Sequence, residues 1–138
     1  MTESNQYYAY FTVSGDFDPA DITALMGIEP TETWEKGSRN ERTHLERKFS
    51  RWSLISRLSR SESIENHIKD VVEQLKPHAA AVSKLAERFS TEIPVVGYFH
   101  QSYPGMHLAP SLLSELGSLH LGLDFDFYYM YSDKREDS

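Results

Sequence analysis

The sequence of 138 residues contains no cysteine, and both basic residues and glycines are sparse. A chain without cysteine forms no disulfide framework and has no thiol to act as a nucleophile or a metal ligand. No apolar run reaches the roughly 20 residues that a membrane-spanning helix requires. The first six residues, MTESNQ, lack the basic and apolar regions of a signal peptide. These absences predict a cytoplasmic protein without a membrane span.

Catalytic motifs are also missing. The seven glycines form neither a phosphate-cradling loop nor a dinucleotide fingerprint, and the six histidines do not follow the H-E-x-x-H spacing of a metal site. No serine lies in a nucleophile elbow. The sequence therefore assigns no catalytic residue, no metal and no cofactor. It favours a protein that is not an enzyme, without deciding the question.

The charge is acidic overall but unevenly distributed. Lysine and arginine number 14 against 21 aspartates and glutamates, which gives a net charge of −7. Residues 36–60 hold eight of the basic residues and two of the acidic ones, so that segment carries +6 and the rest of the chain −13. An acidic chain is a poor ligand for nucleic acid. The segment indicates either a solvated basic loop or a means of steering a charged partner.

The clearest local signals lie in the segment Asp18–Gly37. Asp18 is a good helix N-cap, Pro19 suits the first helical position, and Gly27 suits a left-handed residue after the last turn. Pro30 prevents the helix from resuming. One apolar stripe runs along this helix: Ile22, Leu25 and Met26. We expect the residues that follow, including Trp34 and Lys36, to form a loop, with Trp34 either a lid over the sheet or a ligand contact.

Several pieces of the chain resemble a known family in their order and spacing. They are Tyr8–Gly15, Asp18–Gly37 (DPADITALMGIEPTETWEKG), Trp52–Ser56 (WSLIS) and Leu116–Tyr128, which contains LGLDFDFY. This pattern resembles the bacterial domain-of-unknown-function family 4279. The resemblance covers nearly the whole chain. It implies a shared fold and no established activity, so it transfers no catalytic residue.

Periodicity predicts the remaining elements. Alternating residues indicate strands, and an apolar stripe of period 3.6 indicates helices. The predicted strands are Gln6–Ser14, Arg51–Leu58, Ile93–Gln101 and Leu119–Met130, and the predicted helices are Glu62–Leu75, Val82–Phe89 and Pro110–Leu116. Pro94 favours an edge position for its strand. Gly117 is expected to stop the last helix as Gly27 stops the first.

These elements predict one α+β domain over residues 1–138. Two βαβ-like halves are joined by a long central helix, and a largely antiparallel four-stranded sheet carries its helices on one face, in an arrangement related to ferredoxin-like folds. The ordered core covers about residues 6–131. Residues 37–50 form a basic mobile loop, and residues 132–138 form a polar tail.

The open sheet face is the main candidate site. A sheet with helices on one side leaves its other side to solvent or a ligand. Tyrosine and tryptophan give a recognition surface a large contact area and a polar group, although aromatic residues also pair across strands for stability alone. The candidate binding residues are Tyr8, Tyr10, Thr12, Trp34, Lys36, Tyr98, His100, Asp124, Asp126 and Tyr128.

Two weaker constellations lie within this set. Asp124 and Asp126 are two residues apart on a strand, so they project to one face, where they either raise one another's pKa or simply keep the face charged. His100 and His120 are conceivable metal ligands together with Asp124, although no motif supports such a site. Trp52 begins an apolar strand face and is most simply a core residue.

We hypothesise a non-enzymatic cytoplasmic binding module that recognises a protein partner through its aromatic and acidic sheet face. By analogy of composition, an inhibitor or immunity-type partner of a basic toxin has these properties. Two alternatives stay open. One is a small-ligand sensor or small enzyme with a pocket at Trp34, Tyr10, His100, Asp124 and Asp126, and the other is a homodimer formed through a strand edge.

Overall fold

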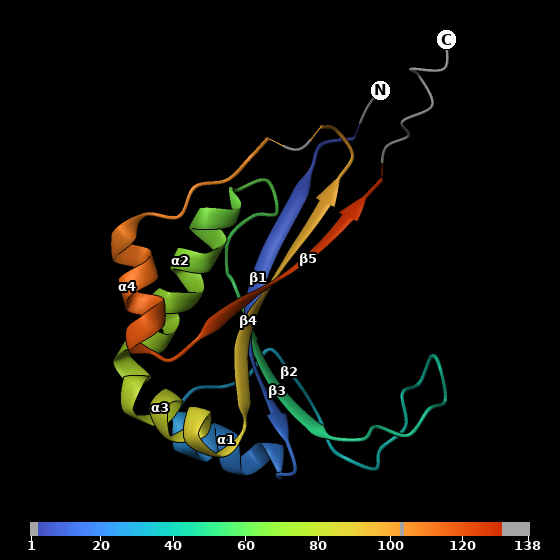
Figure 1. Cartoon of the computed structure of the whole chain (residues 1–138). Coiled ribbons are helices and arrows are strands. Elements are labelled where there is room, and N and C mark those ends of the chain that lie inside the picture. Colours follow the sequence, from blue (N-terminus) through green and yellow to red (C-terminus); the bar gives the residue numbers. More distant parts are fainter. Residues whose placement is uncertain (1–2, 103, 131–138) are drawn as a thin grey trace.

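The computed structural model describes residues 3–102 and 104–130, which form one five-stranded sheet with helices on one of its faces (Figure 1). The strands lie in the order β2-β3-β1-β4-β5, and β4 and β5 are parallel whereas the other neighbours are antiparallel. The elements are β1 (Gln6–Gly15), α1 (Pro19–Met26), β2 (Glu32–Trp34), β3 (Ser50–Ile55), α2 (Ile64–Leu75), the 3-10 turn η1 (Lys76–His78), α3 (Ala79–Arg88), β4 (Ser90–Phe99), α4 (Pro110–Ser118) and β5 (Gly122–Tyr129).

The predicted α+β class and largely antiparallel sheet are confirmed, but the predicted number of four strands is wrong. The additional strand is β2, which lies where we expected a loop and pairs with β3 through Glu32 opposite Ser53 and Trp34 opposite Arg51. Three residues are too few to show an alternating pattern. The segment becomes a strand because the edge of β3 supplies hydrogen-bonding partners, as in the bond from the Thr31 amide to the Ser53 carbonyl at 2.7 Å.

The two predicted βαβ-like halves differ from one another. In the second half, β4, α4 and β5 form a βαβ unit with adjacent parallel strands. In the first half, β1 pairs antiparallel with β3 and does not pair with β2 in the described residues, so no parallel unit forms there. A ferredoxin-like sheet separates its parallel strands by another strand. Because β4 and β5 are direct neighbours, the predicted ferredoxin-like relation is wrong.

The hydrophobic core lies between the sheet and the helices. Along β1, Ala9, Phe11 and Val13 are fully buried, as their alternation predicts. Trp52 is also fully buried, which confirms its predicted core position, and its indole N–H donates to the Thr23 hydroxyl of α1 at 2.9 Å. The predicted stripe of α2 packs onto the sheet with every member buried: Ile64, Ile68, Val71, Val72 and Leu75.

The first helix begins and ends as predicted, whereas the last does not. The Asp18 carboxylate accepts from the Ala20 amide at 3.0 Å, and Gly27 follows α1 with φ of 75°. Gly117 instead lies within α4, which continues to Ser118. The left-handed residue after α4 is His120, with φ of 58°, and the Leu121 amide donates to the Leu116 carbonyl at 3.0 Å, as in a Schellman motif.

Pro94 does not lie on an edge, because β4 runs between β1 and β5. The register of β1 and β4 includes Ala9 opposite Val95 and Thr12 opposite Glu92, but not the two pairs between them. Proline has no N–H to donate to a neighbouring strand. The pairing of β4 with β1 is therefore interrupted at Pro94.

Two strands are shorter than predicted. β3 ends at Ile55, and Leu58, which we expected on its apolar face, is 37% exposed. β5 begins at Gly122, and its helix-facing side is only partly buried, because Phe125 and Tyr129 are 47% and 57% exposed. The helices therefore cover the start of β5 and leave its far end uncovered.

The basic loop between β2 and β3 projects from the body of the sheet (Figure 1). Its two arms are joined by backbone bonds, from the Gly37 amide to the Arg47 carbonyl at 2.9 Å and from the Arg47 amide to the Ser38 carbonyl at 2.7 Å. The mobility of residues 37–50 stays a prediction. The predicted tail, residues 132–138, lies outside the described residues. Among the described residues, no helix has the length and apolarity needed to cross a bilayer.

The two helix-end glycines are expected to respond oppositely to alanine. Gly27→Ala forces a Cβ into a left-handed conformation and should lower the free energy of unfolding by about 1 kcal/mol. Gly117→Ala fills a helical position with no atom within 4 Å of the new Cβ, so it should leave stability unchanged or raise it by up to about 1 kcal/mol. Urea denaturation of both variants measures this. Equal destabilisation by both would contradict the assignment of Gly117 to the helix.

Candidate functional site

The candidate site is the sheet face that carries no helix. The strand registers align its side chains in rows across the sheet: Tyr8 lies opposite Val96, which lies opposite Asp126, and Tyr98 lies opposite Tyr128. The structure therefore brings most of the predicted site residues onto one face. They are Tyr8, Tyr10, Thr12, Trp34, Tyr98, Asp124, Asp126 and Tyr128.

Four tyrosines form a layer over the centre of this face. The rings of Tyr8 and Tyr10 stack with centroids 6.2 Å apart, and those of Tyr98 and Tyr128 stack at 5.2 Å. The layer is packed: Val96 is only 3% exposed, although it lies outside the main core. We call Tyr8, Tyr10, Tyr98 and Tyr128 the tyrosine layer.

Three phenols of the tyrosine layer, those of Tyr8, Tyr10 and Tyr128, have raised pKa values. Burial, followed by the neighbouring Tyr98, raises the pKa of Tyr8 to about 12, and burial also raises the pKa of Tyr10. The Tyr128 hydroxyl donates to Asp126 at 3.1 Å, and this bond raises the pKa of Tyr128. Tyr8, Tyr10 and Tyr128 therefore present neutral hydroxyl groups at physiological pH.

An acidic margin lies on one side of the tyrosine layer. It consists of Glu92 on β4 and of Asp124 and Asp126 on β5, which project to the same face as predicted. Burial and then the charge of Asp124 raise the pKa of Glu92. Glu92 on the neighbouring strand therefore interacts with Asp124, a pairing that the sequence alone did not reveal.

A basic margin lies on the opposite side. The Trp34 ring contacts two guanidinium groups, with the Cζ atoms of Arg47 and Arg51 at 4.8 Å and 5.0 Å from its centroid. The Arg60 guanidinium lies over the ring of Tyr8 at 4.6 Å. Sequence reasoning did not select these three arginines as site residues, although the concentration of positive charge in residues 36–60 was the signal that pointed to them.

Two predicted site residues lie elsewhere. Lys36 forms an ion pair with Asp16 at 3.0 Å, at the turn after β1. His100 follows the end of β4 and lies 3.0 Å from Glu3. Asp124 lies opposite Pro94, six positions before His100, so the two are separated by about 20 Å along the sheet. A single pocket containing both His100 and Asp124 is not formed.

The conceivable metal set is not assembled either. His120 follows α4, next to the start of β5, and His100 lies beyond the opposite end of β4. Within residues 3–102 and 104–130, no three histidines or carboxylates converge in a way that could hold a metal ion.

A buried serine and histidine lie on the helix side of the sheet. The Ser56 hydroxyl is 2.7 Å from Nδ1 of His67, and Nε2 of His67 is 3.0 Å from the Ser59 carbonyl. A carbonyl only accepts, so Nε2 carries the proton and Nδ1 accepts from Ser56. His67 is fully buried and Ser56 is 6% exposed, so no substrate reaches this pair. Its position on the stripe of α2, three residues after Ile64, could have identified His67 as a core residue.

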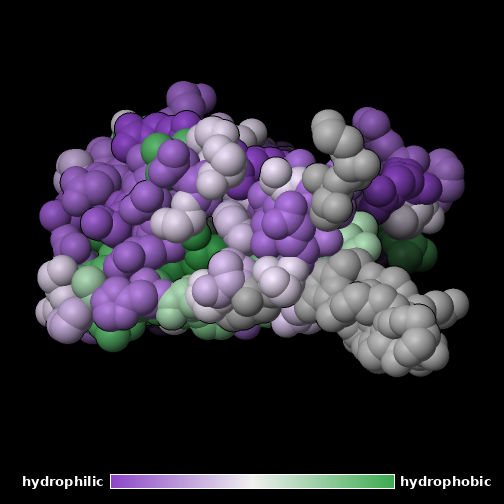
Figure 2. Space-filling model, turned by 90° about the horizontal axis from the view of Figure 1, so that it is seen from above, coloured by the Kyte–Doolittle hydropathy of each residue, from purple (hydrophilic) through white to green (hydrophobic). Residues whose placement is uncertain are grey.

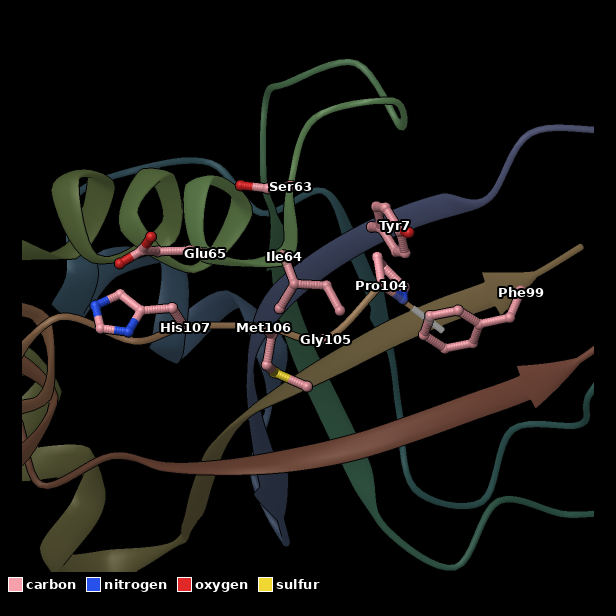
Figure 3. A pocket seen from close by; sticks show the side chains of 9 residues that line it. All are labelled: Tyr7, Ser63, Ile64, Glu65, Phe99, Pro104, Gly105, Met106 and His107. Carbon is pink, nitrogen blue, oxygen red and sulfur yellow. The ribbon is translucent and has the colours of Figure 1, made fainter. Parts of the chain in front are cut away.

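Two hollows of about 210 Å³ each lie near β1. One is on the helix side, between the start of α2 and the segment after β4 (Figure 3), and contains none of the predicted site residues. Its lining is Tyr7, Ser63, Ile64, Glu65, Phe99, Pro104, Gly105, Met106 and His107.

The other hollow is on the open face, between the tyrosine layer and the basic margin, and we call it the sheet hollow. Its lining is Tyr8, Tyr10, Thr31, Glu32, Arg51, Ser53, Ile55 and Arg60.

Seen from above, the molecular surface is mainly hydrophilic, with smaller hydrophobic areas among the polar side chains (Figure 2). Exposed apolar residues include Leu113 at 50% and Phe125 at 47%. Hydrophobicity alone therefore does not single out a site, and the open face is distinguished by its tyrosines and its two charged margins.

A family model matches residues 5–130 of this chain, and the family is described as Domain of unknown function (DUF4279). The chain belongs to this family. The resemblance seen in the sequence is thereby confirmed, and the matched range contains every element of the sheet. Neither the curated proteins nor the solved structures yielded a match. Membership of the DUF4279 family defines the domain and assigns no activity to it.

Tyr8 should lose its proton only near pH 12. A pKa raised in the folded state favours folding fully below the ordinary value of about 10, and this contribution is lost as the pH rises through the folded value. The wild type should therefore lose stability relative to Tyr8→Phe between about pH 10 and pH 12. The difference in tyrosinate absorbance between the two proteins measures the pKa, and a midpoint near 10 would contradict the packed environment of Tyr8.

His67 should titrate below its ordinary pKa of 6.5, because burial lowers the pKa. The neutral form is then favoured by folding, so this contribution is present above about pH 6.5 and is lost as the pH falls toward the folded pKa. The wild type should lose stability relative to His67→Gln over that range, by at most about 1.4 kcal/mol per pH unit. NMR titration of the His67 ring measures the pKa directly, and a value above 6.5 would refute this assignment.

Proposed function

We propose that this protein is a non-enzymatic cytoplasmic binding module that recognises a protein partner through its open sheet face. The observation that carries the proposal is the tyrosine layer, in which four packed rings cover a face without helices. Tyrosine combines large contact area with few rotatable bonds, so binding costs little side-chain entropy. Because stacking already restrains these rings, much of that cost is met during folding.

The face has the extent of a protein-binding surface. The five strands are about 4.8 Å apart and range from three residues in β2 to ten in β1 and β4, so together they cover roughly 500 Å² in flat projection. Standard interfaces bury about 800 Å² on each partner. The relief of the side chains enlarges the face beyond its flat projection, toward that area.

The charges of the face favour a partner with a basic region. Glu92, Asp124 and Asp126 place carboxylates beside the tyrosine layer, and the chain as a whole carries −7. Complementary charge raises the rate of encounter and excludes acidic competitors. An inhibitor or immunity-type role toward a basic protein is consistent with this electrostatic pattern.

Adjacent tyrosines on β5 provide a test with a matched control. Tyr128 belongs to the open face and is 44% exposed, whereas Tyr129 projects to the helix side and is 57% exposed. Affinity purification from the native cell at low salt should recover a stoichiometric protein with the wild type and with Tyr129→Ala. Tyr128→Ala should weaken that complex about 30-fold, as expected for loss of an aromatic hot spot worth about 2 kcal/mol.

Formation of the complex should also depend on the salt concentration. Raising the salt concentration should weaken the complex, because the acidic margin steers the partner. Recovery of no stoichiometric protein, or equal loss with Tyr128→Ala and Tyr129→Ala, would overturn the proposal. Sedimentation of the purified protein identifies a second copy of the chain if that is the partner recovered.

A further inference from the structure

The sheet hollow is a formed cavity at the boundary between the tyrosine layer and the basic margin. Its residues come from four segments: β1, β2 with the residue before it, β3, and the turn that follows β3. Its volume of about 210 Å³ is several times the roughly 30 Å³ that one water molecule occupies in the liquid. The hollow can therefore hold a small organic group as well as a single ion.

Two arginines line the hollow with their hydrogen-bonding edges unused. The guanidinium of Arg60 stacks on Tyr8, and that of Arg51 stacks on Trp34 and lies 5.7 Å from the centroid of Phe49. Stacking occupies the faces of a guanidinium and leaves its N–H groups in the plane. Among the described residues, neither arginine lies within 4 Å of a carboxylate oxygen, and Nε of Arg51 is buried without a hydrogen-bond partner.

Arg57, close by in the sequence, has a guanidinium group that is hydrogen-bonded to a carboxylate. Its Nε and one terminal nitrogen both donate to Asp70, at 3.1 Å and 2.8 Å to Oδ1. Such paired bonds are the geometry in which guanidinium groups bind carboxylates. Arg51 and Arg60 have no equivalent acceptor in the described residues, so they keep the capacity to bind an oxyanion from outside the chain.

The remaining lining selects the kind of oxyanion. Glu32 also lines the hollow, so its charge and those of the two arginines sum to +1, which suits a monoanion better than a phosphate dianion. Burial raises the pKa of Tyr10, so its hydroxyl stays protonated and can donate to a ligand. The Thr31 hydroxyl oxygen accepts from the Ile55 amide at 2.9 Å and keeps its own proton to donate. The rings of the tyrosines and the side chain of Ile55 provide apolar walls beside these donors.

We propose that the sheet hollow binds a carboxylate that is attached to a flat or apolar body, with the Arg60 guanidinium holding the carboxylate, Arg51 adding positive charge to the lining, and Tyr10 and Ile55 contacting the body. This chemistry is found in a small aromatic acid and in the C-terminal carboxylate of a peptide that ends in an aromatic residue. The site does not depend on the proposed partner face, although the two share Tyr8 and Tyr10.

The test uses benzoate as the probe. In an NMR titration at constant ionic strength, benzoate should cause saturable shifts at the amides of Ser53 and Ile55. Benzamide, which is neutral and has nearly the same shape, should cause none, and inorganic phosphate should bind more weakly than benzoate. Linear shifts, equal shifts with benzamide, or tighter binding of phosphate would overturn the proposal without any variant being needed.

Arg60→Gln and Arg88→Gln form a matched pair of variants. Both change the net charge equally, and both arginines stack on an aromatic ring, but Arg88 lies at Phe89, away from the hollow. Arg60 is exposed, so its replacement should not disturb folding. Arg60→Gln should weaken benzoate binding at least about tenfold, because charge-assisted bonds are lost. Arg88→Gln should leave it unchanged, and equal binding by the wild type and Arg60→Gln would refute the site.

Two further probes distinguish the sources of the carboxylate. A tripeptide ending in phenylalanine, with a free C-terminus, should bind at least about tenfold more tightly than benzoate if the natural ligand is a peptide end, and its C-terminal amide should not bind. Similar affinities for the tripeptide and benzoate indicate a small acid. Because no partner protein is present in these titrations, their failure leaves the proposed partner face untouched, and failure of partner capture leaves the hollow untouched.

Discussion

Pairing of β1 on both of its edges is the constraint on which the rest of the structure depends. β3 and β4 both pair with β1, so every other strand takes its position directly or indirectly from it. Because successive side chains of a strand point to opposite faces, β1 separates its residues into two sets. Phe11 enters the core beneath the helices, whereas Tyr8 and Tyr10 reach the face that no helix covers.

The open face contains buried residues as well as exposed ones. Thr12 and Val96 belong to this face and are nevertheless 1% and 3% exposed. With no helix on that side, neighbouring side chains on the sheet have to cover them, and the tyrosine layer does this for Val96. Phenol rings are suited to the task, since their faces bury apolar atoms while their hydroxyl groups stay in contact with water. The same property suits the layer to the proposed role of a partner-binding surface.

The basic margin forms where β2 pairs with β3 at the edge of the sheet. Adding β2 to β3 brings Trp34 opposite Arg51, and the loop between the two strands returns Arg47 to the same ring. The guanidinium groups of Arg47 and Arg51 then lie against the Trp34 ring, whereas Asp124 and Asp126 lie on β5, on the other side of the tyrosine layer. A face with a neutral aromatic centre and margins of opposite charge can bind an oxyanion on one side and a basic group on the other.

The sequence by itself determined the features that depend on local chemistry. Asp18 and Gly27 delimit α1, the apolar stripe of α2 places Ile68 and Leu75 in the core, and the alternation of β1 predicts both of its faces. The family could also be recognised from the sequence, since its pattern consists of short motifs in a set order. Most candidate residues of the open face could be named because they lie on well-patterned strands.

Tertiary structure alone decided which residues meet. The strand β2 exists because β3 offers it an edge, Glu92 meets Asp124 through the parallel register of β4 and β5, and Ser56 meets His67 across the boundary between sheet and helix. The sheet hollow likewise assembles Tyr8, Thr31 and Arg60 from separate segments. Periodicity says which face a side chain is on, but register and strand order fix its neighbours, and these follow from the packing of distant segments against one another.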